Sequence, residues 1–241
     1  MNKLTIMLKK YWYLFFVPVF IGLTACHDDN EEPEQRESYL SCPDDHHPHL
    51  INLDLPSGTL WACCNVGATA PENSGGYYAW GETEEKSEGY DWKNYIYSNG
   101  SQYSFIDIGL TICGTEYDVA HVKWGGYWQM PSFEQIQELI AKCSHEWTEV
   151  NGTKGIKFIG VNGGSIFMPA AWRKIKDNPY KEEIGCYWSG TRSFPVQPTV
   201  QDDKYNYLYV SKAHELHLSK NSCVFYGENR EFGLTVRPVA K

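Results

Sequence analysis

The chain has 241 residues, of which 42% are hydrophobic and 15% aromatic, and its formal net charge is −9. This length suits one domain, or one domain with a tether, and is sufficient for a substantial core. Removing residues 1–25 takes away three lysines and no acidic residue, so the charge of the remaining chain becomes −12. An acidic surface repels phosphate backbones, which argues against nucleic-acid binding and against docking on anionic headgroups without an acyl chain.

The first 25 residues have the composition of an export signal. Three lysines precede an uncharged, mostly apolar run at 11–23, and Leu-Thr-Ala-Cys then ends at Cys26. The run is too short for a comfortable membrane span, which favours a signal peptide over a signal anchor. Leu-Thr-Ala-Cys resembles the lipobox of bacterial lipoproteins, which implies lipidation at Cys26. The acidic residues that follow resemble the export tag of surface lipoproteins in Bacteroides-type bacteria. We therefore expect a lipid-anchored protein of the bacterial outer membrane, exposed at the cell surface.

Residues 26–47 are polar, acidic and nearly free of aliphatic side chains, so we expect a flexible tether before a domain at 48–241. Carboxylate and imidazole groups gather near its end, at Asp44, Asp45, His46, His47 and His49. These groups are ligands for transition metals. The alternative is a solvated linker that binds metal only opportunistically, and we favour it because nothing in the sequence preorganises the ligands. The sequence therefore predicts no metal site and no cofactor.

Seven cysteines follow Cys26. Export permits disulfides, but an odd number leaves at least one thiol free unless it pairs between chains. No C-x-x-C pair occurs, so a structural zinc site has little support. The predicted disulfide joins Cys64 to Cys143, and the alternative is two buried thiols.

One amphipathic helix is strongly indicated at 133–143. Apolar residues recur on one face, and Ser132 with Gln135 has the spacing of a capping box. Pro131 keeps the preceding backbone out of the helix. A glycine pair, Gly125-Gly126, lets Trp124 and Trp128 approach one backbone corner. A shorter helical turn, capped by Asp118, is predicted at 118–122.

Alternating hydrophobicity and turn residues predict the strands. A hairpin is expected at 51–55 and 60–64, and a meander at 146–150, 155–160 and 165–168. Residues 77–81 are read as an aromatic strand or corner, and 82–117 as loop. Further strands are expected at 185–189, 205–210, 215–218, 223–226 and 233–239.

Several motifs occur in the order of a known family: HLINLDLPSGTLWACCNVGATAPENSGGYYAWGET, HVKWGGYWQMPSFEQIQELI, NGGSIFMPAA, YWSG and VRPV. They resemble the Fibrobacter succinogenes major paralogous domain, found in lipoproteins of gut Bacteroidetes, and cover residues 49–239. The corner and the VRPV end also resemble the formylglycine-generating branch of C-type-lectin-like folds. The resemblance implies an α+β domain with short twisted antiparallel sheets, two short helices, long ordered loops and chain ends that come close together. Its scaffold residues would be Trp61, Trp80, Trp124, Gly125, Gly126, Trp128, Pro131, Trp188 and Arg237. Arg237 is expected to pair with a carboxylate.

The resemblance does not extend to catalysis. Formylglycine-generating enzymes hold copper with two cysteines spaced C-x4-C, but the position five residues after Cys223 is Glu228. Common hydrolase, zincin and phosphate-binding motifs are missing, as are the Glu-Pro-Asn and Trp-Asn-Asp motifs of sugar-binding lectins. We therefore expect a non-catalytic domain that binds a glycan or a protein partner. The alternatives are a structural or adhesin subunit of a surface assembly and, with less support, a formylglycine-generating-like oxidase. The predicted ligand-binding residues are the loop aromatics Trp92, Tyr95, Tyr97 and Tyr103.

Overall fold

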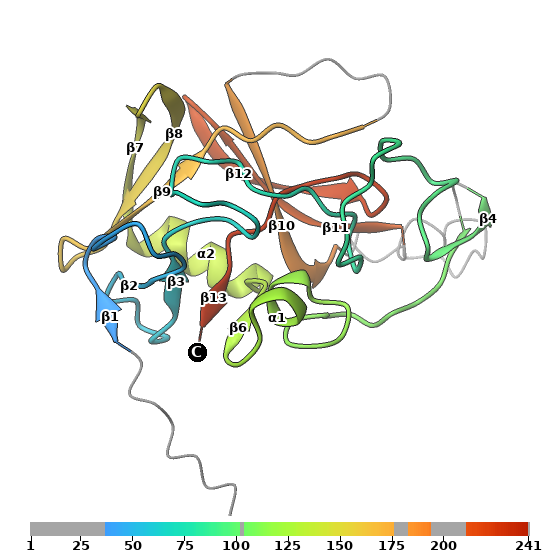
Figure 1. Cartoon of the computed structure of the whole chain (residues 1–241), viewed down its shortest axis with the longest axis horizontal. Helices are drawn as coiled ribbons and strands as arrows, with labels where there is room; N and C mark the ends of the chain where they lie inside the picture. Colours follow the sequence, from blue (N-terminus) through green and yellow to red (C-terminus); the bar gives the residue numbers. More distant parts are fainter. Residues whose placement is uncertain (1–36, 102–103, 176–182, 194–210, 241) are drawn as a thin grey trace, which may run out of the picture. The chain divides into compact units, whose positions relative to one another are not determined.

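The structure, a computed structural model, describes residues 37–101, 104–175, 183–193 and 211–240. The chain divides into two units, Met1–Gln35 and Arg36–Lys241, and all described residues belong to the second. Cys26, Tyr103 and the strand predicted at 205–210 lie outside the described residues, as does the predicted signal peptide. The described residues form a mixed α+β fold of small, mostly antiparallel sheets with two helices (Figure 1), which confirms that part of the fold prediction.

A five-stranded sheet holds both the first and the last described strand. Its order is β1 (Ser38–Tyr39), β2 (Leu50–Asn52), β3 (Leu60–Ala62), β13 (Val239–Ala240) and β6 (Trp128–Gln129). β1 runs parallel to β2, and the other neighbours are antiparallel. The predicted hairpin is confirmed in β2 and β3. Near the chain end, the strand expected at 233–239 is shorter than predicted, because residues 233–235 form isolated bridges to separate segments.

Three smaller sheets complete the fold. The predicted meander is confirmed as β7 (Ser144–Val150), β8 (Thr153–Ile159) and β9 (Ser165–Pro169). A second antiparallel sheet consists of β10 (Ile184–Arg192), β11 (Lys212–Ser219) and β12 (Ser222–Asn229). A small hairpin, β4 (Ser98–Ser101) with β5 (Ser104–Phe105), lies in the stretch predicted as loop. Residues 77–81 form a corner in which Tyr78 bridges Leu234.

Helix α2 (Phe133–Lys142) forms as predicted. The Ser132 hydroxyl accepts a hydrogen bond from the Gln135 amide, and the Gln135 side chain accepts one from the Ser132 amide, which completes the capping box. Ile136 and Leu139 face the core and are buried. The shorter helix α1 (Val119–Trp124) begins at Asp118, whose carboxylate accepts hydrogen bonds from two amides of its first turn. No helix among the described residues is both long and apolar enough to cross a membrane.

The corner between the helices requires its two glycines. Gly125 and Gly126 have φ angles of 67° and 55°, in the left-handed region that favours glycine. This backbone brings the rings of Trp124 and Trp128 to a centroid distance of 5.1 Å in an edge-to-face arrangement. The Pro131 carbonyl then accepts a hydrogen bond from the Gly190 amide, which fastens the corner to β10. Trp61, Trp80 and Trp188 are fully buried, whereas Trp124 is half-buried.

Arg237 does not pair with a carboxylate, contrary to the prediction. Its Nη1 donates to the carbonyl oxygens of Ala62 and Cys63, at 3.1 and 2.8 Å, and its Nε donates to Asn65 Oδ1 at 2.7 Å. Nη2 donates to the Phe167 carbonyl at 2.8 Å. A guanidinium has five donors in a fixed plane, so carbonyls at the end of β3 can satisfy it without an acid. A buried positive charge therefore lies beside Cys63.

The predicted disulfide between Cys64 and Cys143 is absent. Both residues are free thiols in one hydrophobic cluster that joins the β2–β3 hairpin, α2 and the meander. The alternative of two buried thiols is therefore the one that the structure shows.

Candidate metal centre

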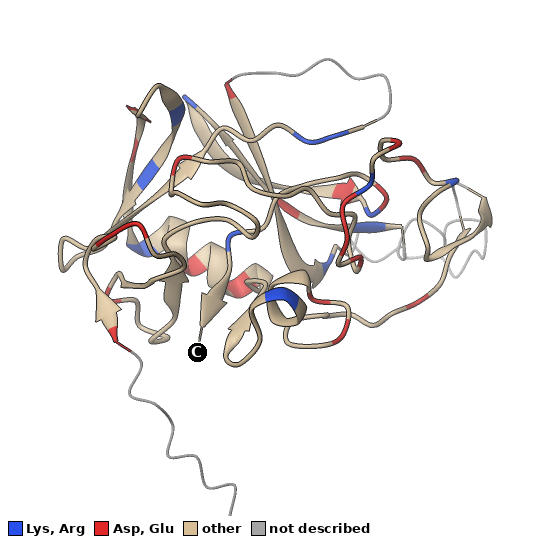
Figure 2. Ribbon diagram, viewed as in Figure 1, with Lys and Arg blue, Asp and Glu red and all other residues tan. Residues whose placement is uncertain are grey.

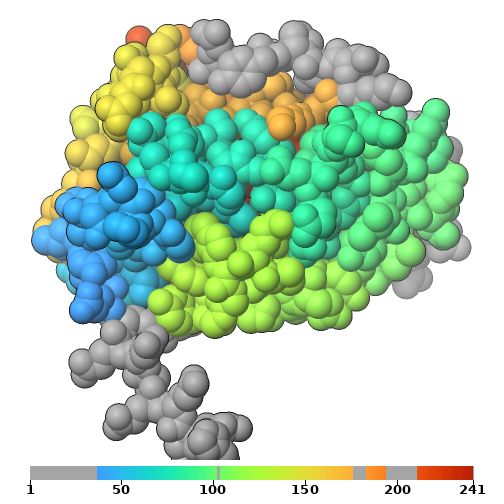
Figure 3. All heavy atoms as spheres, viewed as in Figure 1, coloured from blue at the N-terminus to red at the C-terminus, as the bar shows by residue number. Residues whose placement is uncertain are grey.

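Residues 37–47, which were predicted to belong to a tether, pack against the rest of the domain. β1 pairs with β2 at Ser38 and Tyr39, and the Leu40 carbonyl accepts a hydrogen bond from the Ser165 amide. In the space-filling view, the blue N-terminal segment and the cyan residues that follow β3 form a continuous surface (Figure 3). The predicted boundary at residue 48 is therefore too late. The polar composition of 37–47 did not reveal that backbone pairing orders this segment.

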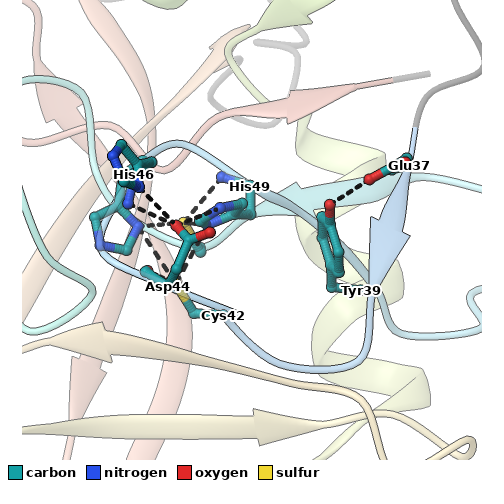
Figure 4. A network of polar contacts seen from close by, with 8 residues as sticks. Glu37, Tyr39, Cys42, Asp44, His46 and His49 are labelled. Carbon is teal, nitrogen blue, oxygen red and sulfur yellow. Dashed lines mark hydrogen bonds and ion pairs between the residues drawn. The ribbon is translucent and has the colours of Figure 1, made fainter.

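This packing assembles what we call the N-terminal cluster, which consists of Cys42, His47, His49 and Cys63. Cys42 lies in the loop between the parallel strands β1 and β2, and His47 and His49 come shortly before β2. Figure 4 shows Cys42, Asp44 and His49 close together. Cys63 directly follows β3. Leu50 pairs with Ala62, and the Cys63 amide donates to the His49 carbonyl at 3.0 Å, so the β2–β3 register sets these two residues side by side.

The donor atoms of the cluster lie close enough to share one ion. One ligand atom from each residue lies within 4.8 Å of all the others. Cys42 Sγ is 3.3 Å from Nδ1 of both His47 and His49. Cys63 Sγ is 3.1 Å from His47 Nδ1 and 3.7 Å from His49 Nδ1. Zn–S and Zn–N bonds of about 2.3 and 2.0 Å at tetrahedral angles place sulfur and nitrogen about 3.5 Å apart. The four observed separations bracket that value.

The surroundings of the cluster are those of a metal site as well. His49 directs Nδ1 at the sulfurs and Nε2 at Asp44 Oδ1, 3.2 Å away. A carboxylate on the outer nitrogen fixes the orientation of a histidine ligand and raises its basicity. The backbone amide of His49 donates to Cys63 Sγ at 3.1 Å. Donors of this kind stabilise a thiolate.

The two thiols differ in their electrostatic environment. Hydrogen bonds from Cys64 and from the His49 amide, with the Arg237 charge, lower the pKa of Cys63 well below its usual range. Burial and the neighbouring negative charge of Cys63 raise the pKa of Cys42. One thiolate is therefore favoured in the free cluster, and the second cysteine supplies its thiolate when a cation arrives. Two thiolates with two neutral imidazoles balance the charge of a divalent ion.

A second cluster of ligating residues lies on the β10–β11 pair. We call Cys186, Glu215 and His217 the strand cluster, and one ligand atom of each lies within 4.8 Å of the others. Within the described ranges, these two clusters are the groups of three or more cysteine, histidine and acidic residues that could hold a metal ion. Burial and the Glu215 charge raise the pKa of the Cys186 thiol.

The predicted aromatic binding surface is only partly exposed. Tyr95 is 3% exposed, its hydroxyl donates to the Trp80 carbonyl at 2.7 Å, and Arg230 Nε donates to the same hydroxyl at 2.9 Å. It is a core residue, so its assignment to ligand binding was wrong. Tyr97 is half-buried and packs edge-on against Tyr95 at a centroid distance of 5.6 Å. Trp92 is also half-buried.

The histidines of the N-terminal cluster stand out in the sequence as candidate ligands, whereas its cysteines do not. Cys42 precedes His47 and His49 with the spacing C-x4-H-x-H, which is a visible signal. Cys63 joins them only through the hairpin register. The searches of protein-family models, curated proteins and solved structures gave no match for this chain.

Proposed function

We propose that the N-terminal cluster binds one Zn²⁺ ion, which fastens residues 42–49 to the β2–β3 hairpin. The observation that carries this proposal is the convergence of two sulfur and two nitrogen donors within 4.8 Å. Two thiolates and two imidazoles suit Zn²⁺, and four protein ligands fill its tetrahedral shell. A filled shell leaves no position for substrate, so the proposed ion has a structural role.

Metal analysis of the purified, reduced chain tests this proposal. We expect the Cys42→Ser/Cys63→Ser variant to contain one zinc equivalent less than the unmodified chain. Co²⁺ in place of zinc is expected to give the intense visible absorption of a tetrahedral site together with sulfur-to-cobalt charge transfer. Cys223→Ser is the matched control, because Cys223 is a partly buried thiol of β12 that belongs to neither cluster. Equal zinc content in the double variant and the unmodified chain would contradict the proposal.

At the level of the whole chain, we propose a surface-anchored bacterial lipoprotein of the outer membrane, lipidated at Cys26. We also propose that its domain has a C-type-lectin-like fold related to the Fibrobacter succinogenes major paralogous domain. Placement of the first and last strands in one sheet supports this fold assignment. Mass spectrometry of the protein recovered from membranes tests the anchor: a first residue other than an acylated Cys26 would overturn it.

The proposed role of the domain is non-catalytic binding of a glycan or an envelope protein. The partial exposure of Trp92 and Tyr97 supports this role, since such rings stack on sugars or anchor protein contacts. Glycan-array binding that is lost in Trp92→Ala would favour a glycan. A silent array together with co-purification of envelope proteins would instead favour a structural or adhesin subunit. Figure 2 shows acidic and basic residues interspersed along the described elements.

A further inference from the structure

The strand cluster is built on two paired strands, β10 and β11. Cys186 of β10 lies directly opposite His217 of β11 in the antiparallel register. Glu215 precedes His217 by two residues, and side chains two apart on a strand point to the same face. The three side chains therefore converge because two paired strands hold them, without a flexible loop. Sites on strands are positioned more accurately than sites on loops.

The spacing of the donor atoms approaches that of a metal site. His217 Nδ1 lies 3.3 Å from Glu215 Oε1 and 4.0 Å from Cys186 Sγ. A tetrahedral zinc ion requires about 3.3 Å between nitrogen and oxygen ligands and about 3.5 Å between nitrogen and sulfur. The first distance fits as it stands, and the second requires a contraction of about 0.5 Å. The same nitrogen faces both partners, so the three residues do not have the geometry of a nucleophile, base and orienting acid, which uses both nitrogens of the histidine.

The charges around the cluster leave room for a cation. Glu215 is completely buried, and its Oε2 has no hydrogen-bond partner among the described residues. Arg173 Nη1 lies 3.9 Å from Glu215 Oε1, but it directly contacts Glu228 Oε2. One guanidinium therefore faces two carboxylates. A buried charge without full compensation is costly, and a cation beside Glu215 would remove that cost.

We propose that Cys186, Glu215 and His217 form a second metal site, which takes a divalent transition-metal ion of the zinc class through one thiolate, one carboxylate and one imidazole. The thiolate and Glu215 neutralise the two charges of the ion, while Arg173 and Glu228 remain paired. Three protein donors leave one tetrahedral position to water or an added ligand, as in open zinc sites. The side chain of His217 is 18% exposed, so the cluster reaches the solvent at the imidazole.

This site is independent of the proposed role of the N-terminal cluster, and the experiment keeps the two apart. The full chain with Cys42→Ser and Cys63→Ser is titrated with Co²⁺ under reducing conditions. We expect one equivalent to bind at the strand cluster, with a sulfur-to-cobalt band. We expect azide to shift the spectrum, because azide can occupy the open position.

Two further substitutions in the Cys42→Ser/Cys63→Ser chain test whether the bound ion lies at the strand cluster. Glu215→Gln retains the shape of the side chain, His217→Asn removes the imidazole, and each is expected to abolish the stoichiometric binding. His145→Asn on the exposed strand β7 is the control and is expected to leave it unchanged. If circular dichroism shows that Cys42→Ser/Cys63→Ser does not fold, the titration uses the chain that retains Cys42 and Cys63. That chain should bind two equivalents, and Glu215→Gln should reduce this number to one.

Two results would overturn the proposal. One is a folded background that binds no Co²⁺, and the other is binding that survives both substitutions. A spectrum that does not respond to azide would overturn the open fourth position. Loss of zinc from the N-terminal cluster alone has no bearing on these outcomes.

Discussion

The N-terminal cluster and the strand cluster both combine cysteine and histidine, but they rest on different kinds of backbone. Cys42, His47 and His49 lie on a connecting segment that is held by the two-residue strand β1 and a few loop hydrogen bonds. Cys186 and His217 lie on β10 and β11, which are nine and eight residues long and pair in continuous register from Ile184 to Trp188. The first cluster can therefore gain its local order from a metal ion. The second already has that order from its backbone.

The electrostatic surroundings of the two clusters also differ, and they too favour a bound cation more at the N-terminal cluster than at the strand cluster. At the N-terminal cluster, amide and thiol donors with the Arg237 charge favour a thiolate at Cys63. At the strand cluster, burial and a carboxylate favour the neutral thiol of Cys186, and Arg173 is already close to Glu215. Similar side chains thus form one closed site that favours a divalent cation and one three-ligand site where a cation meets competition. We therefore expect a metal ion at the N-terminal cluster to stabilise the fold, and a metal ion at the strand cluster to bind to a fold that is already formed.

The largest expected effect is on stability after zinc removal. At free zinc about 1,000-fold above the dissociation constant, binding to the native state stabilises it by about 4 kcal/mol. We expect a chelator to lower the free energy of unfolding more in the unmodified chain than in Cys42→Ser/Cys63→Ser, by about that amount, as measured by denaturant titration. Hydrogen exchange locates the effect: amides at 42–49 should exchange faster without zinc, while those of β10 and β11 keep their protection. An equal loss of protection in both regions would contradict the claim that the metal ion orders residues 42–49 but not β10 and β11.

A smaller effect is expected at the carboxylate behind His49. Asp44 Oδ1 is 3.2 Å from His49 Nε2, and loss of such an outer partner lowers metal affinity by about 10-fold to 100-fold. Asp44→Ala should therefore weaken zinc binding at the N-terminal cluster within that range, as measured by competition with a coloured chelator. Asp45→Ala removes the same charge from the next, exposed position and is the matched control. Equal effects of the two variants would show that net charge, and not the contact with His49, determines the affinity.

The sequence predicts the local features of this fold well because their signals are local. The capping box and apolar stripe of α2 lie within a dozen residues. The left-handed conformations of Gly125 and Gly126 were predictable because residues with a Cβ atom rarely adopt positive φ, whereas glycine does so readily. Register and distant pairing are not encoded in this way. Cys63 reaches His49 only because Leu50 pairs with Ala62, and the polar composition before residue 48 hides the pairing of β1.

Tyr95 and the strand cluster show the same limit. An aromatic residue in a polar loop resembles a binding residue, but Arg230, 135 positions later, supplies the partner that buries Tyr95. Strands near Cys186 and His217 were predicted, yet the pattern does not state that these strands are neighbours or which residues lie opposite each other. The N-terminal cluster likewise depends on a register that the predicted hairpin did not specify. The strand cluster required coordinates.

The smallest expected effect tests the competition at the strand cluster. Arg173 Nη1 is 3.9 Å from Glu215 Oε1, beyond hydrogen-bond distance, and its direct partner is Glu228, so we expect its attraction to Glu215 to be worth about 1 kcal/mol or less. Arg173→Met removes the cation that a metal ion must compete with, and Co²⁺ affinity in the Cys42→Ser/Cys63→Ser background should rise up to about fivefold. Lys174→Met is the control, since the Lys174 ammonium lies over the Tyr77 ring. Unchanged binding in Arg173→Met would mean that the guanidinium does not compete with the metal ion for Glu215, and weaker binding would mean that it supports the cluster.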